Sequence, residues 1–295
     1  MLTPADKERI DRFVAKIRDV GTDEQRMHMA VLTELSAIHR RVNPKTGEPY
    51  APTTNRSLIT DYRNVIKAEL GEDAPVLEKF KYSAARVTEY RQHQQEQREE
   101  RHRNQRPLNA QEHIERAVAL LSYNAKVRWS NAAAIAGVVA LTGRRPYEVG
   151  CVGGFEPDPA DEPRVFFSGQ TKTREAERAA TAYSIPVLAE RDLMLETVAR
   201  IREEVDPALD NKTYSQRFGK EVGIVAKRTF TDADGQPITP RELREAYAAV
   251  AYRKFASRKI SEVQFYNEVL GHQGTDLNTS LFYFAFYVDD SSELQ

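Results

Sequence analysis

The segment 91–106, RQHQQEQREERHRNQR, contains no apolar side chain in sixteen consecutive positions. Such a segment has nothing to bury, so it forms an exposed helix end or a linker and cannot belong to a hydrophobic core. The chain is 295 residues long, which is enough for two packed domains. We therefore place the domain boundary in this segment and expect one domain at 1–105 and a second at 106–295.

The composition excludes membrane-spanning and disulfide-rich proteins. No stretch approaches the roughly 18 apolar residues of a spanning helix, and the N-terminal MLTPADKERI has no apolar run typical of a signal peptide. Cys151 is the single cysteine, which rules out an internal disulfide and a cysteine-rich zinc site. His93 and His102 have no third donor at a useful spacing. We expect an intracellular protein without a metal or other cofactor.

Apolar residues recur at helical spacing through the first hundred residues and predict four helices. Thr3 and Pro4 begin the first, and Thr22 with Gln25 predicts a capping box for the second. A loop rich in turn-forming residues precedes the third helix. The fourth begins near Pro75 and runs into the polar segment. The first domain is therefore expected to be entirely helical.

The second domain begins with a capping box at Asn109 and Glu112. The next helix, NAAAIAGVVALTG, ends at Gly143 and is almost uncharged, which is typical of a helix at the centre of a core. Two β-prone runs then flank a charged turn in RVFFSGQTKTREAERAATAYSIPVL and predict a hairpin. Helices return to the end of the chain. The expected fold class is mainly α (α+β), with one small sheet.

Common catalytic motifs are missing: the sequence has no GxxxxGK[ST], HExxH or GxSxG. The net charge is −1, from 43 basic and 44 acidic residues, and gives no overall signal for nucleic acid. Basic residues are nevertheless concentrated at 81–106, seven against four acidic, and at 241–260, six against two. Either run alone is most simply a solvated helix face.

Arg145 and Lys172 are the first candidate site residues. Arg145 lies in LTGRRPYEV between Gly143, which ends the apolar helix, and Pro146, which can begin another element. On its own it is also compatible with a structural arginine that caps carbonyls. Lys172 lies in SGQTKTR at the tip of the predicted hairpin, where a long cation can reach a ligand, although a solvated lysine is the more common outcome.

Two arginines open a later helix. In ITPRELREAY, Thr239, Pro240 and Glu242 predict a helix start with a capping box. Arg241 and Arg244 occupy its opening turns with the spacing of one helix face, where free N–H groups and the helix dipole favour an anion such as phosphate. Two exposed arginines are the simpler interpretation, but basic residues in a first turn are electrostatically disfavoured.

His272 and Tyr283 are the last candidates. His272, in VLGHQG, follows a helix that begins at Ser261 with Gln264, and a cation suits any helix C-terminus. Tyr283 belongs to the aromatic cluster of NTSLFYFAFYV, whose members are by default core residues. Taken singly, each candidate has a structural explanation.

Taken in order, the candidates reproduce the arginine, lysine, arginine, histidine, tyrosine succession of the tyrosine recombinase superfamily: Arg145, Lys172, Arg244, His272 and Tyr283. TGRRPYE resembles the segment of the first arginine, SGQTK the β-hairpin lysine, RELR the HxxR motif, and LGH with its tyrosine the C-terminal box. Within the superfamily, TGRRPYEV, SGQTKTR and the compact length after LGH most resemble the telomere resolvases, or protelomerases. The resemblance covers about 140–288.

Two positions depart from the pattern. Arg241 stands where many recombinases have histidine, so an acid–base role there is in doubt, although a cation still binds phosphate. The interval from His272 to Tyr283 is longer than in ordinary integrases, which leaves Tyr287 as a reserve nucleophile. Tyr283 is preferred because NTSLFY aligns more naturally with the family's box.

The resemblance implies cleavage of a DNA strand through a 3′-phosphotyrosine link and its rejoining without a cofactor or a small-molecule substrate. Tyr283 would be the nucleophile and Lys172 would protonate the leaving 5′ oxygen. The fold implied is a helical DNA-clamping domain and a mixed helical catalytic domain with a small sheet or hairpin. The cations expected to contact DNA are Arg144, Arg174, Arg253, Lys254, Arg258 and Lys259.

For a telomere resolvase, the partner is double-stranded DNA with an inverted-repeat target site, bound by a homodimer that releases two hairpin ends. The location implied is the bacterial cytoplasm or nucleoid, with a phage or plasmid as a possible source, and no membrane partner. A conventional integrase that exchanges strands between two duplexes has the same residues. The sequence also leaves open a noncatalytic DNA-binding descendant and a helical interaction protein with no DNA role.

Overall fold

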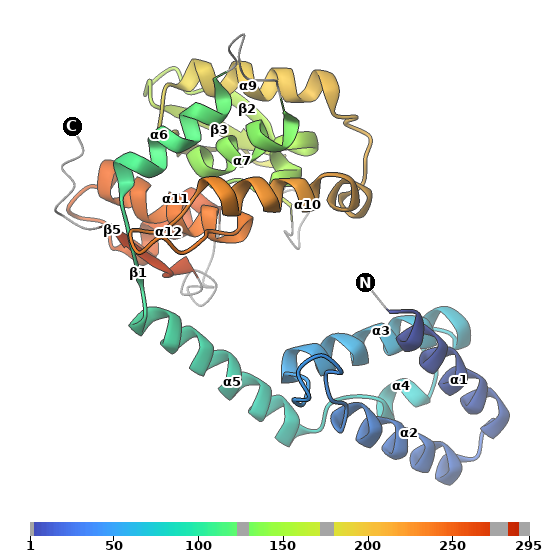
Figure 1. The fold of residues 1–295 in the computed structure, drawn as a ribbon. Coiled ribbons are helices and arrows are strands. Elements are labelled where there is room, and N and C mark those ends of the chain that lie inside the picture. The colour runs from blue at the N-terminus through green and yellow to red at the C-terminus, as the bar shows by residue number, and fades with distance from the viewer. Residues whose placement is uncertain (1–2, 123–129, 172–179, 272–282, 289–295) are drawn as a thin grey trace. The chain divides into compact units, whose positions relative to one another are not determined.

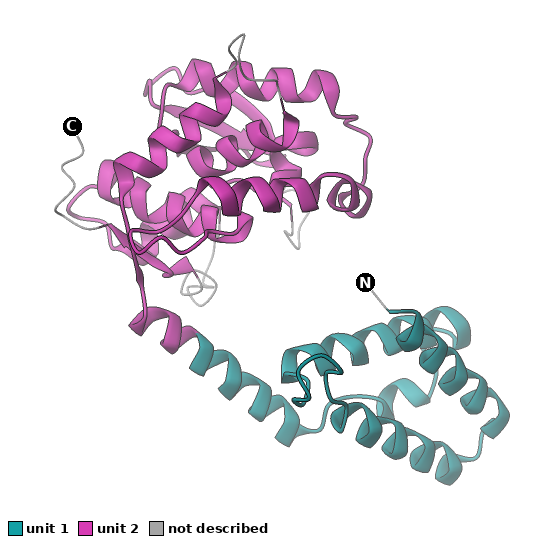
Figure 2. Cartoon of the chain, viewed as in Figure 1, with its two compact units in different colours: residues 1–97 teal, residues 98–295 magenta. Residues whose placement is uncertain are grey.

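The computed structural model describes residues 3–122, 130–171, 180–271 and 283–288. The chain forms two compact units, residues 1–97 and residues 98–295 (Figure 2). The boundary between them falls inside the polar segment 91–106. No helix in the described ranges is both long enough and apolar enough to cross a membrane. The two units are described separately below.

The first unit is helical (Figure 1) and contains α1 (Pro4–Val20), α2 (Glu24–His39), α3 (Pro52–Leu70), α4 (Val76–Lys79) and most of α5 (Ala84–Arg103). Its core is aromatic at the centre: the rings of Phe13 and Tyr62 each contact Phe80, with ring centres 5.0 Å apart in both pairs. Thr3 caps α1 as expected, because its side chain accepts the Asp6 N–H at 3.0 Å.

Two local predictions for this unit are wrong. Helix α2 is capped by Asp23, not by Thr22, because the carboxylate accepts the N–H groups of Gln25 and Arg26 at 3.1 and 3.0 Å. The fourth helix does not run unbroken into the polar segment, because α4 ends where Phe80 enters the core.

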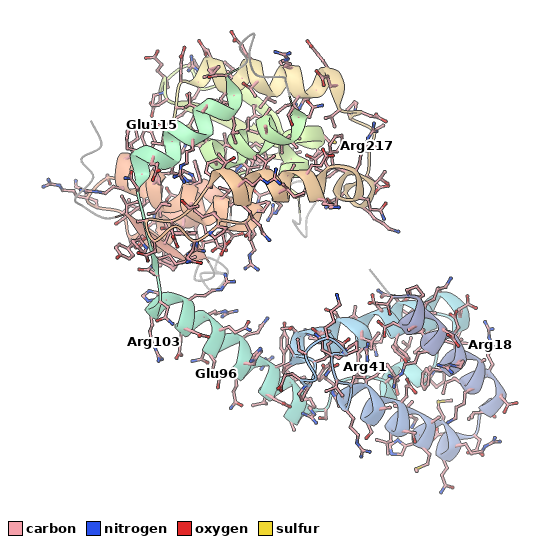
Figure 3. The ribbon with its side chains drawn as sticks, viewed as in Figure 1. Arg18, Arg41, Glu96, Arg103, Glu115 and Arg217 are labelled. Carbon is pink, nitrogen blue, oxygen red and sulfur yellow. The ribbon has the colours of Figure 1, made fainter. Side chains whose placement is uncertain are left out.

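Helix α5 carries the polar segment and, as expected, buries none of its side chains. Charged residues such as Glu96 and Arg103 project outward from it (Figure 3). Arg103 pairs with Glu99 one turn earlier, with Nη2 to Oε2 at 2.9 Å. A helix of this kind is stabilised by its own i, i+4 pairs and not by an apolar face.

The second unit is built around α7 (Asn131–Thr142), of which ten of the twelve residues are buried. Four helices pack against it, namely α6 (Ala110–Leu121), α9 (Arg191–Glu204), α10 (Asn211–Thr229) and α11 (Pro240–Phe255). Gly137 permits the closest approach, because a Cβ there would lie 2.3 Å from Leu121 Cδ1. The almost uncharged helix is therefore central to the core, as its sequence predicts (Figure 1).

The predicted hairpin belongs to a three-stranded antiparallel sheet, ordered β2 (Gly154–Pro157), β3 (Arg164–Ser168) and β4 (Tyr183–Pro186). Phe166 of β3 faces Ser184 of β4 in the register. A short π-helix, η1 (Glu148–Val152), leads from α7 toward this sheet. These elements confirm a mainly α fold with a small sheet.

A second pair of strands has no counterpart among the sequence-based expectations. Strand β1 (Arg106–Leu108) pairs in parallel with β5 (Phe286–Val288), which lies next to α11, and α11 in turn packs on α12 (Glu262–Leu270). Each strand has three residues and the partners are far apart in sequence, so neither period nor turn residues reveal the pairing. Arg106 reinforces it, because its Nε donates to Asp232 Oδ2 at 2.5 Å and its guanidinium lies 5.0 Å from the Phe286 ring centre.

Candidate active site

The turn that ends α7 places two consecutive arginines in different environments. Gly143 follows Thr142 with a φ of 66°, in the left-handed region that favours glycine. A Cβ at this position would lie 2.3 Å from the ring of Tyr247, so a side chain has no space there. The turn sends Arg144 into the core and leaves Arg145 partly exposed.

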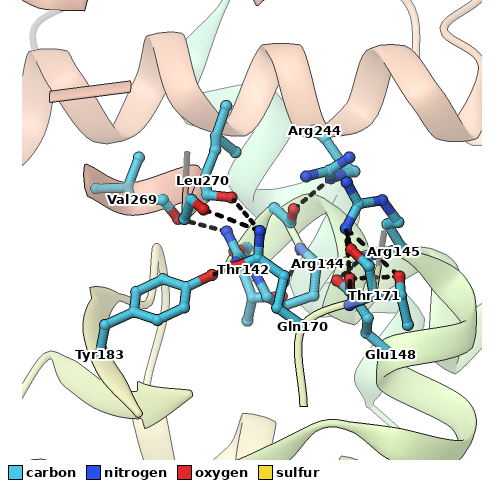
Figure 4. A network of polar contacts seen from close by, with 12 residues as sticks. Thr142, Arg144, Arg145, Glu148, Gln170, Thr171, Tyr183, Arg244, Val269 and Leu270 are labelled. Carbon is cyan, nitrogen blue, oxygen red and sulfur yellow. Dashed lines mark hydrogen bonds and ion pairs between the residues drawn. The ribbon is translucent and has the colours of Figure 1, made fainter. Parts of the chain in front are cut away.

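Glu148 is the anion beside Arg145 (Figure 4). Its buried carboxylate accepts the Arg145 backbone N–H at 2.8 Å and Arg145 Nη1 at 2.5 Å. Its Oε1 also accepts the backbone N–H and the hydroxyl of Thr171, at 2.8 and 2.7 Å. Arg145 Nη1 donates in turn to the Thr171 carbonyl at 2.9 Å. One carboxylate thus holds both the first candidate arginine and the residue directly before Lys172.

Arg244 lies beside Tyr283. Its Nε donates to the Gly143 carbonyl at 2.6 Å, and its Nη1 donates to Tyr283 Oη at 3.2 Å. The guanidinium carbon lies 5.4 Å from the centre of the Tyr283 ring. Arg244 is buried, and its Nη2 has no hydrogen-bond partner among the described residues. An anion that reaches this position would meet an arginine with a donor to spare.

Three arginines, Arg144, Arg145 and Arg244, face one glutamate in this cluster, which leaves an excess of positive charge. Burial acts to raise the pKa of Glu148, but the charges of the arginines outweigh it and hold the pKa at about 2. Burial lowers the pKa of the Arg244 guanidinium. Partly desolvated arginines of this kind favour a planar or tetrahedral oxyanion, because charge-assisted hydrogen bonds are strongest away from water.

The chain after Tyr283 is anchored by its aromatic neighbours. Phe284 is buried and stacks on Tyr266, with ring centres 5.0 Å apart and an interplanar angle of 23°. Phe286 is buried within β5. Tyr287, in contrast, is 45% exposed and lies opposite Pro107 in the β1–β5 pair. The described geometry places Tyr283 at the arginine cluster and Tyr287 at the surface.

Three sequence-predicted residues, Lys172, Arg174 and His272, lie outside the described residues. Their chain neighbours Thr171 and Gly271 lie inside them. Gly271 is the left-handed C-cap of α12, with a φ of 71°. The helix that precedes His272 therefore begins and ends where the sequence predicts.

Arg241 and Arg244 occupy different environments. The capping box at Thr239 and Glu242 is confirmed, but the Arg241 side chain is 63% exposed and pairs with Glu245 at 3.3 Å, whereas Arg244 faces the core. The two arginines therefore do not share one face. Four further cations expected to contact DNA are exposed: Arg253, Lys254, Arg258 and Lys259.

Arg144 corrects the sequence analysis, which expects it to contact DNA, because the residue is fully buried. Its Nε donates to the Thr142 carbonyl at 3.1 Å, and its two terminal nitrogens donate to Tyr183 and to the Val269 carbonyl. A fully buried guanidinium whose three nitrogens each donate to an internal acceptor is not exposed to a DNA phosphate. The physical reason is the left-handed turn at Gly143, after which Arg144 enters the core.

Sequence reasoning missed Glu148 and Thr171. Glu148 follows Arg145 by three residues in RRPYE, and this spacing is the signal that identifies it as a partner. Nothing in the sequence shows that the same carboxylate reaches Thr171, because that contact joins segments more than twenty residues apart.

The comparisons agree with this arrangement. The family described as telomere resolvase ResT/TelK catalytic domain matches residues 104–286. A solved protelomerase TelA, covalently complexed with substrate DNA, is 27% identical with a TM-score of 0.80 and covers 98% of this chain and 90% of its own. A TelA variant complexed with a DNA hairpin product is 26% identical with a TM-score of 0.82, covering 99% and 91%.

Protelomerase TelK, complexed with substrate DNA, is 20% identical with a TM-score of 0.58, covers 98% of this chain and 61% of its own, and shares the fold. No curated protein matches the chain. The family match runs from the residue after α5 to the first residue of β5, so it spans the whole of the arginine cluster and includes Tyr283. The chain belongs to the telomere resolvase family of ResT and TelK.

Proposed function

We propose that the chain cuts and rejoins DNA through a covalent 3′-phosphotyrosine link and converts replicated telomeres into closed hairpin ends. The contact that carries this proposal is the one between buried Arg244 and Tyr283, at 3.2 Å, beside Arg145 and Glu148. A TelA relative bound covalently to substrate DNA and a TelA variant in complex with a hairpin product support the same chemistry.

In the cleavage step, Tyr283 Oη attacks the scissile phosphorus, forming the tyrosyl–phosphate bond as the bond to the 5′ oxygen breaks. Attack builds negative charge on the nonbridging oxygens, which Arg145 and Arg244 stabilise with planar, permanently charged donors. A phenol is a weak nucleophile near neutral pH. The phenol loses its proton to solvent, and the Arg244 donor at its oxygen stabilises the negative charge that develops.

The remaining roles follow from the family resemblance. Lys172 protonates the leaving 5′ oxygen, His272 binds the phosphate, and Arg241 is an outer, auxiliary phosphate contact. For rejoining, the 5′ hydroxyl of the complementary strand attacks the phosphotyrosine, forms the new phosphodiester and releases Tyr283. One phosphoester bond replaces another in each step, so no energy source is consumed.

The assembly proposed is a homodimer on an inverted-repeat site. The domain at 1–105 would clamp the DNA while 106–295 carries the chemistry. Exposed cations would contact the phosphates and give affinity that falls with salt: Arg174, Arg253, Lys254, Arg258 and Lys259. A DNA substrate of this kind places the enzyme in the bacterial cytoplasm or nucleoid.

The test uses supercoiled plasmid that carries the inverted repeats of the replicon encoding this chain, incubated with the protein in EDTA. Products are separated on a denaturing gel. Strands that snap back into hairpins establish telomere resolution. Exchanged or integrated products would make the chain a conventional recombinase, and no covalent protein–DNA species on these sites would contradict cleavage.

Two tyrosine variants provide the matched controls. Tyr283→Phe should bind the same DNA with unchanged affinity and form no covalent adduct, because the attacking oxygen is gone. Tyr287→Phe removes an exposed hydroxyl four residues later and should form the adduct normally. An adduct that persists in Tyr283→Phe and disappears in Tyr287→Phe would move the nucleophile to Tyr287.

A further inference from the structure

A buried chain of hydrogen bonds connects Arg144 to the end of α12 (Figure 4). Arg144 Nη1 donates to the hydroxyl of Tyr183, and this hydroxyl donates to Gln170 Oε1 at 2.6 Å. Gln170 Nε2 then donates to the Gly271 carbonyl at 3.0 Å. The Tyr183 hydroxyl and the Gln170 amide each accept one bond and donate the next, and the charged guanidinium at one end polarises the whole chain.

The same residues satisfy the last carbonyls of α12, which have no partner inside the helix. Arg144 Nη2 donates to the Val269 carbonyl, and Gln170 Nε2 lies 3.5 Å from the Leu270 carbonyl. A buried cation at a helix C-terminus also opposes the negative end of the helix dipole. Helix α12 is therefore capped by side chains from two other segments of the unit.

The contact leaves no free space at Gly271. A Cβ there would lie 1.9 Å from Gln170 Oε1 and 2.3 Å from Tyr183 Oη. The backbone of the turn after α12 thus touches the side chains of the hairpin directly. Movement of either segment would break the hydrogen-bond chain.

Burying this series of hydrogen bonds costs more free energy than filling the same part of the core with apolar side chains. Arg144 is fully buried and Gln170 is 8% exposed, and burial of polar groups costs free energy that well-packed apolar residues would avoid. Gln170 lies outside β3 and β4, and Tyr183 pairs with Phe167 through its backbone, so the strand register requires neither side chain. A polar chain at this position therefore calls for a role beyond packing.

The position of Gln170 in the sequence supplies that role. It precedes Thr171, which Glu148 holds by two hydrogen bonds, and Thr171 precedes Lys172. Gly271, which accepts the last hydrogen bond of the series, directly precedes His272. The two segments that lead into the lysine and the histidine are joined to each other through Gln170.

We propose that Arg144, Tyr183 and Gln170 are positioning residues, which fix the segment leading into Lys172 against the end of α12 so that the lysine reaches the leaving 5′ oxygen. The proposal rests on the proposed function, in which Lys172 is the general acid. None of the three is a catalytic residue, because each acts through the backbone of a neighbouring segment.

The test compares two DNA substrates in single-turnover cleavage by Tyr183→Phe and Gln170→Leu. One substrate is ordinary, and the other has sulfur in place of the bridging 5′ oxygen at the scissile phosphate. A thiolate leaves without a proton, so this substrate does not need the general acid. We expect the variants to lose on the order of 10-fold to 100-fold on the oxygen substrate, part of what a general acid contributes, and to recover to within about 3-fold on the sulfur substrate.

Tyr247→Phe is the matched control. Its hydroxyl is also buried in this unit and donates to the Pro186 carbonyl at 2.7 Å, away from Gln170. It should lower the melting temperature about as much as Tyr183→Phe while cleaving both substrates at the wild-type rate. Equal losses on the two substrates in Tyr183→Phe and Gln170→Leu would overturn the positioning role and reduce it to stability.

Lys172→Ala separates failure of this proposal from failure of the proposed function. Rescue of Lys172→Ala by sulfur, without rescue of Gln170→Leu, would leave the general acid in place and overturn the positioning role alone. No rescue of Lys172→Ala would overturn the general-acid assignment itself, and the positioning role with it. Rescue of Lys172→Ala, Tyr183→Phe and Gln170→Leu by sulfur would support both the general-acid assignment and the positioning role.

Discussion

Glu148 and Glu245 are both fully buried, and each lies near a candidate active-site arginine, yet their carboxylates are held differently. Glu148 accepts four hydrogen bonds from Arg145 and Thr171. Glu245 Oε1 lies 3.3 Å from Arg241 Nε and 3.5 Å from Arg101 Nη1, while its Oε2 has no hydrogen-bond partner in the described part of the chain. The pKa of Glu148 is about 2, whereas burial raises the pKa of Glu245 to about 7.

Because the two carboxylates are equally buried, the difference between their pKa values comes from the groups that donate to them. At Glu148 two of the donors are backbone N–H groups and the nearest guanidinium is mostly shielded. At Glu245 the donors are two arginine side chains, 41% and 63% exposed, whose charges are screened by water. With a pKa of about 2, Glu148 is ionised near neutral pH, whereas Glu245, with a pKa of about 7, changes charge there.

Glu148→Gln should have the largest effect. The amide cannot accept all four hydrogen bonds, and it leaves three buried or half-buried arginines without an anion. We expect the unfolding free energy to fall by about 3–5 kcal/mol, as when one partner of a buried pair is removed. Adduct formation should fall by about 100-fold or more, comparable to the loss of a transition-state donor. Denaturant unfolding and single-turnover cleavage measure the two.

Aspartate provides the contrast for that result. Glu148→Asp keeps the charge but shortens the reach, so it should recover part of the stability while cleavage stays low. A Glu148→Gln variant that cleaves at the wild-type rate would show that Arg145 and Thr171 are held by other contacts, and the comparison with Glu245 would lose its meaning.

The acid side of the stability profile should carry the signature of Glu148. Its folded pKa of about 2 lies below the ordinary value of 4.5, so its contribution is present above pH 4.5 and is lost as the pH falls through 2. The wild type should therefore lose on the order of 1–3 kcal/mol relative to Glu148→Gln between pH 5 and pH 2. Parallel profiles of the two proteins would contradict an ionised, strongly held carboxylate.

Glu245 should give the opposite slope in the neighbouring window. Its folded pKa of about 7 lies above 4.5, so its contribution is fully present below pH 4.5 and is lost as the pH rises through 7. Glu245→Gln, which mimics the protonated form, should gain on the order of 1–2 kcal/mol over the wild type between pH 5 and pH 8. The groups that face this carboxyl are Arg101 of α5, Arg241, Glu242 and Arg244 of α11, and Tyr266 of α12.

Glu112→Gln is the control for this slope, because Glu112 is also a part-exposed glutamate in the first turn of a helix and pairs with Arg116, but is not among the groups that face Glu245. It should keep the wild-type slope between pH 5 and pH 8. A Glu245→Gln profile that parallels the wild type would show that the buried carboxyl remains ionised across this range.

Local signals in the sequence predict much of this fold. The uncharged run NAAAIAGVVALTG predicts the central helix. The polar run 91–106 predicts an exposed helix end or a linker, and helix α5 there buries no side chain. Both predictions rest on the composition of consecutive residues. The β1–β5 pair was not predictable, since it joins two strands of three residues from opposite ends of the second unit. Its stability comes from tertiary packing, which neither propensity nor period records.

For the candidate site, the ordered succession of residue types led to Arg145, Arg244 and Tyr283. Arg145 and Arg244 lie side by side (Figure 4), and Arg244 donates to the Tyr283 hydroxyl. The direction of a side chain is a different matter. Arg144 and Arg145 are neighbours of the same type, and only the left-handed turn at Gly143 decides that the first is buried. The Glu148–Thr171 contact and the contacts of Gln170 are not predictable for a related reason, because they join different segments of the chain.

Arg241→Ala should have the smallest effect. It tests whether the exposed arginine that pairs with Glu245 contributes to cleavage. Arg241 is mostly solvated and its pairing with Glu245 is one of two that share a single oxygen, so its loss removes a screened charge and not a buried donor. We expect cleavage to fall by about 10-fold or less, as for the loss of an auxiliary phosphate contact, with a smaller deficit at high salt, because salt screens the exposed charge. Arg244→Ala, three residues later, is the matched control and should lose about 100-fold or more, because it removes a desolvated donor. Equal losses in the two variants would mean that Arg241 turns inward when DNA binds, and that the Glu245 side of the cluster takes part in catalysis as directly as the Glu148 side.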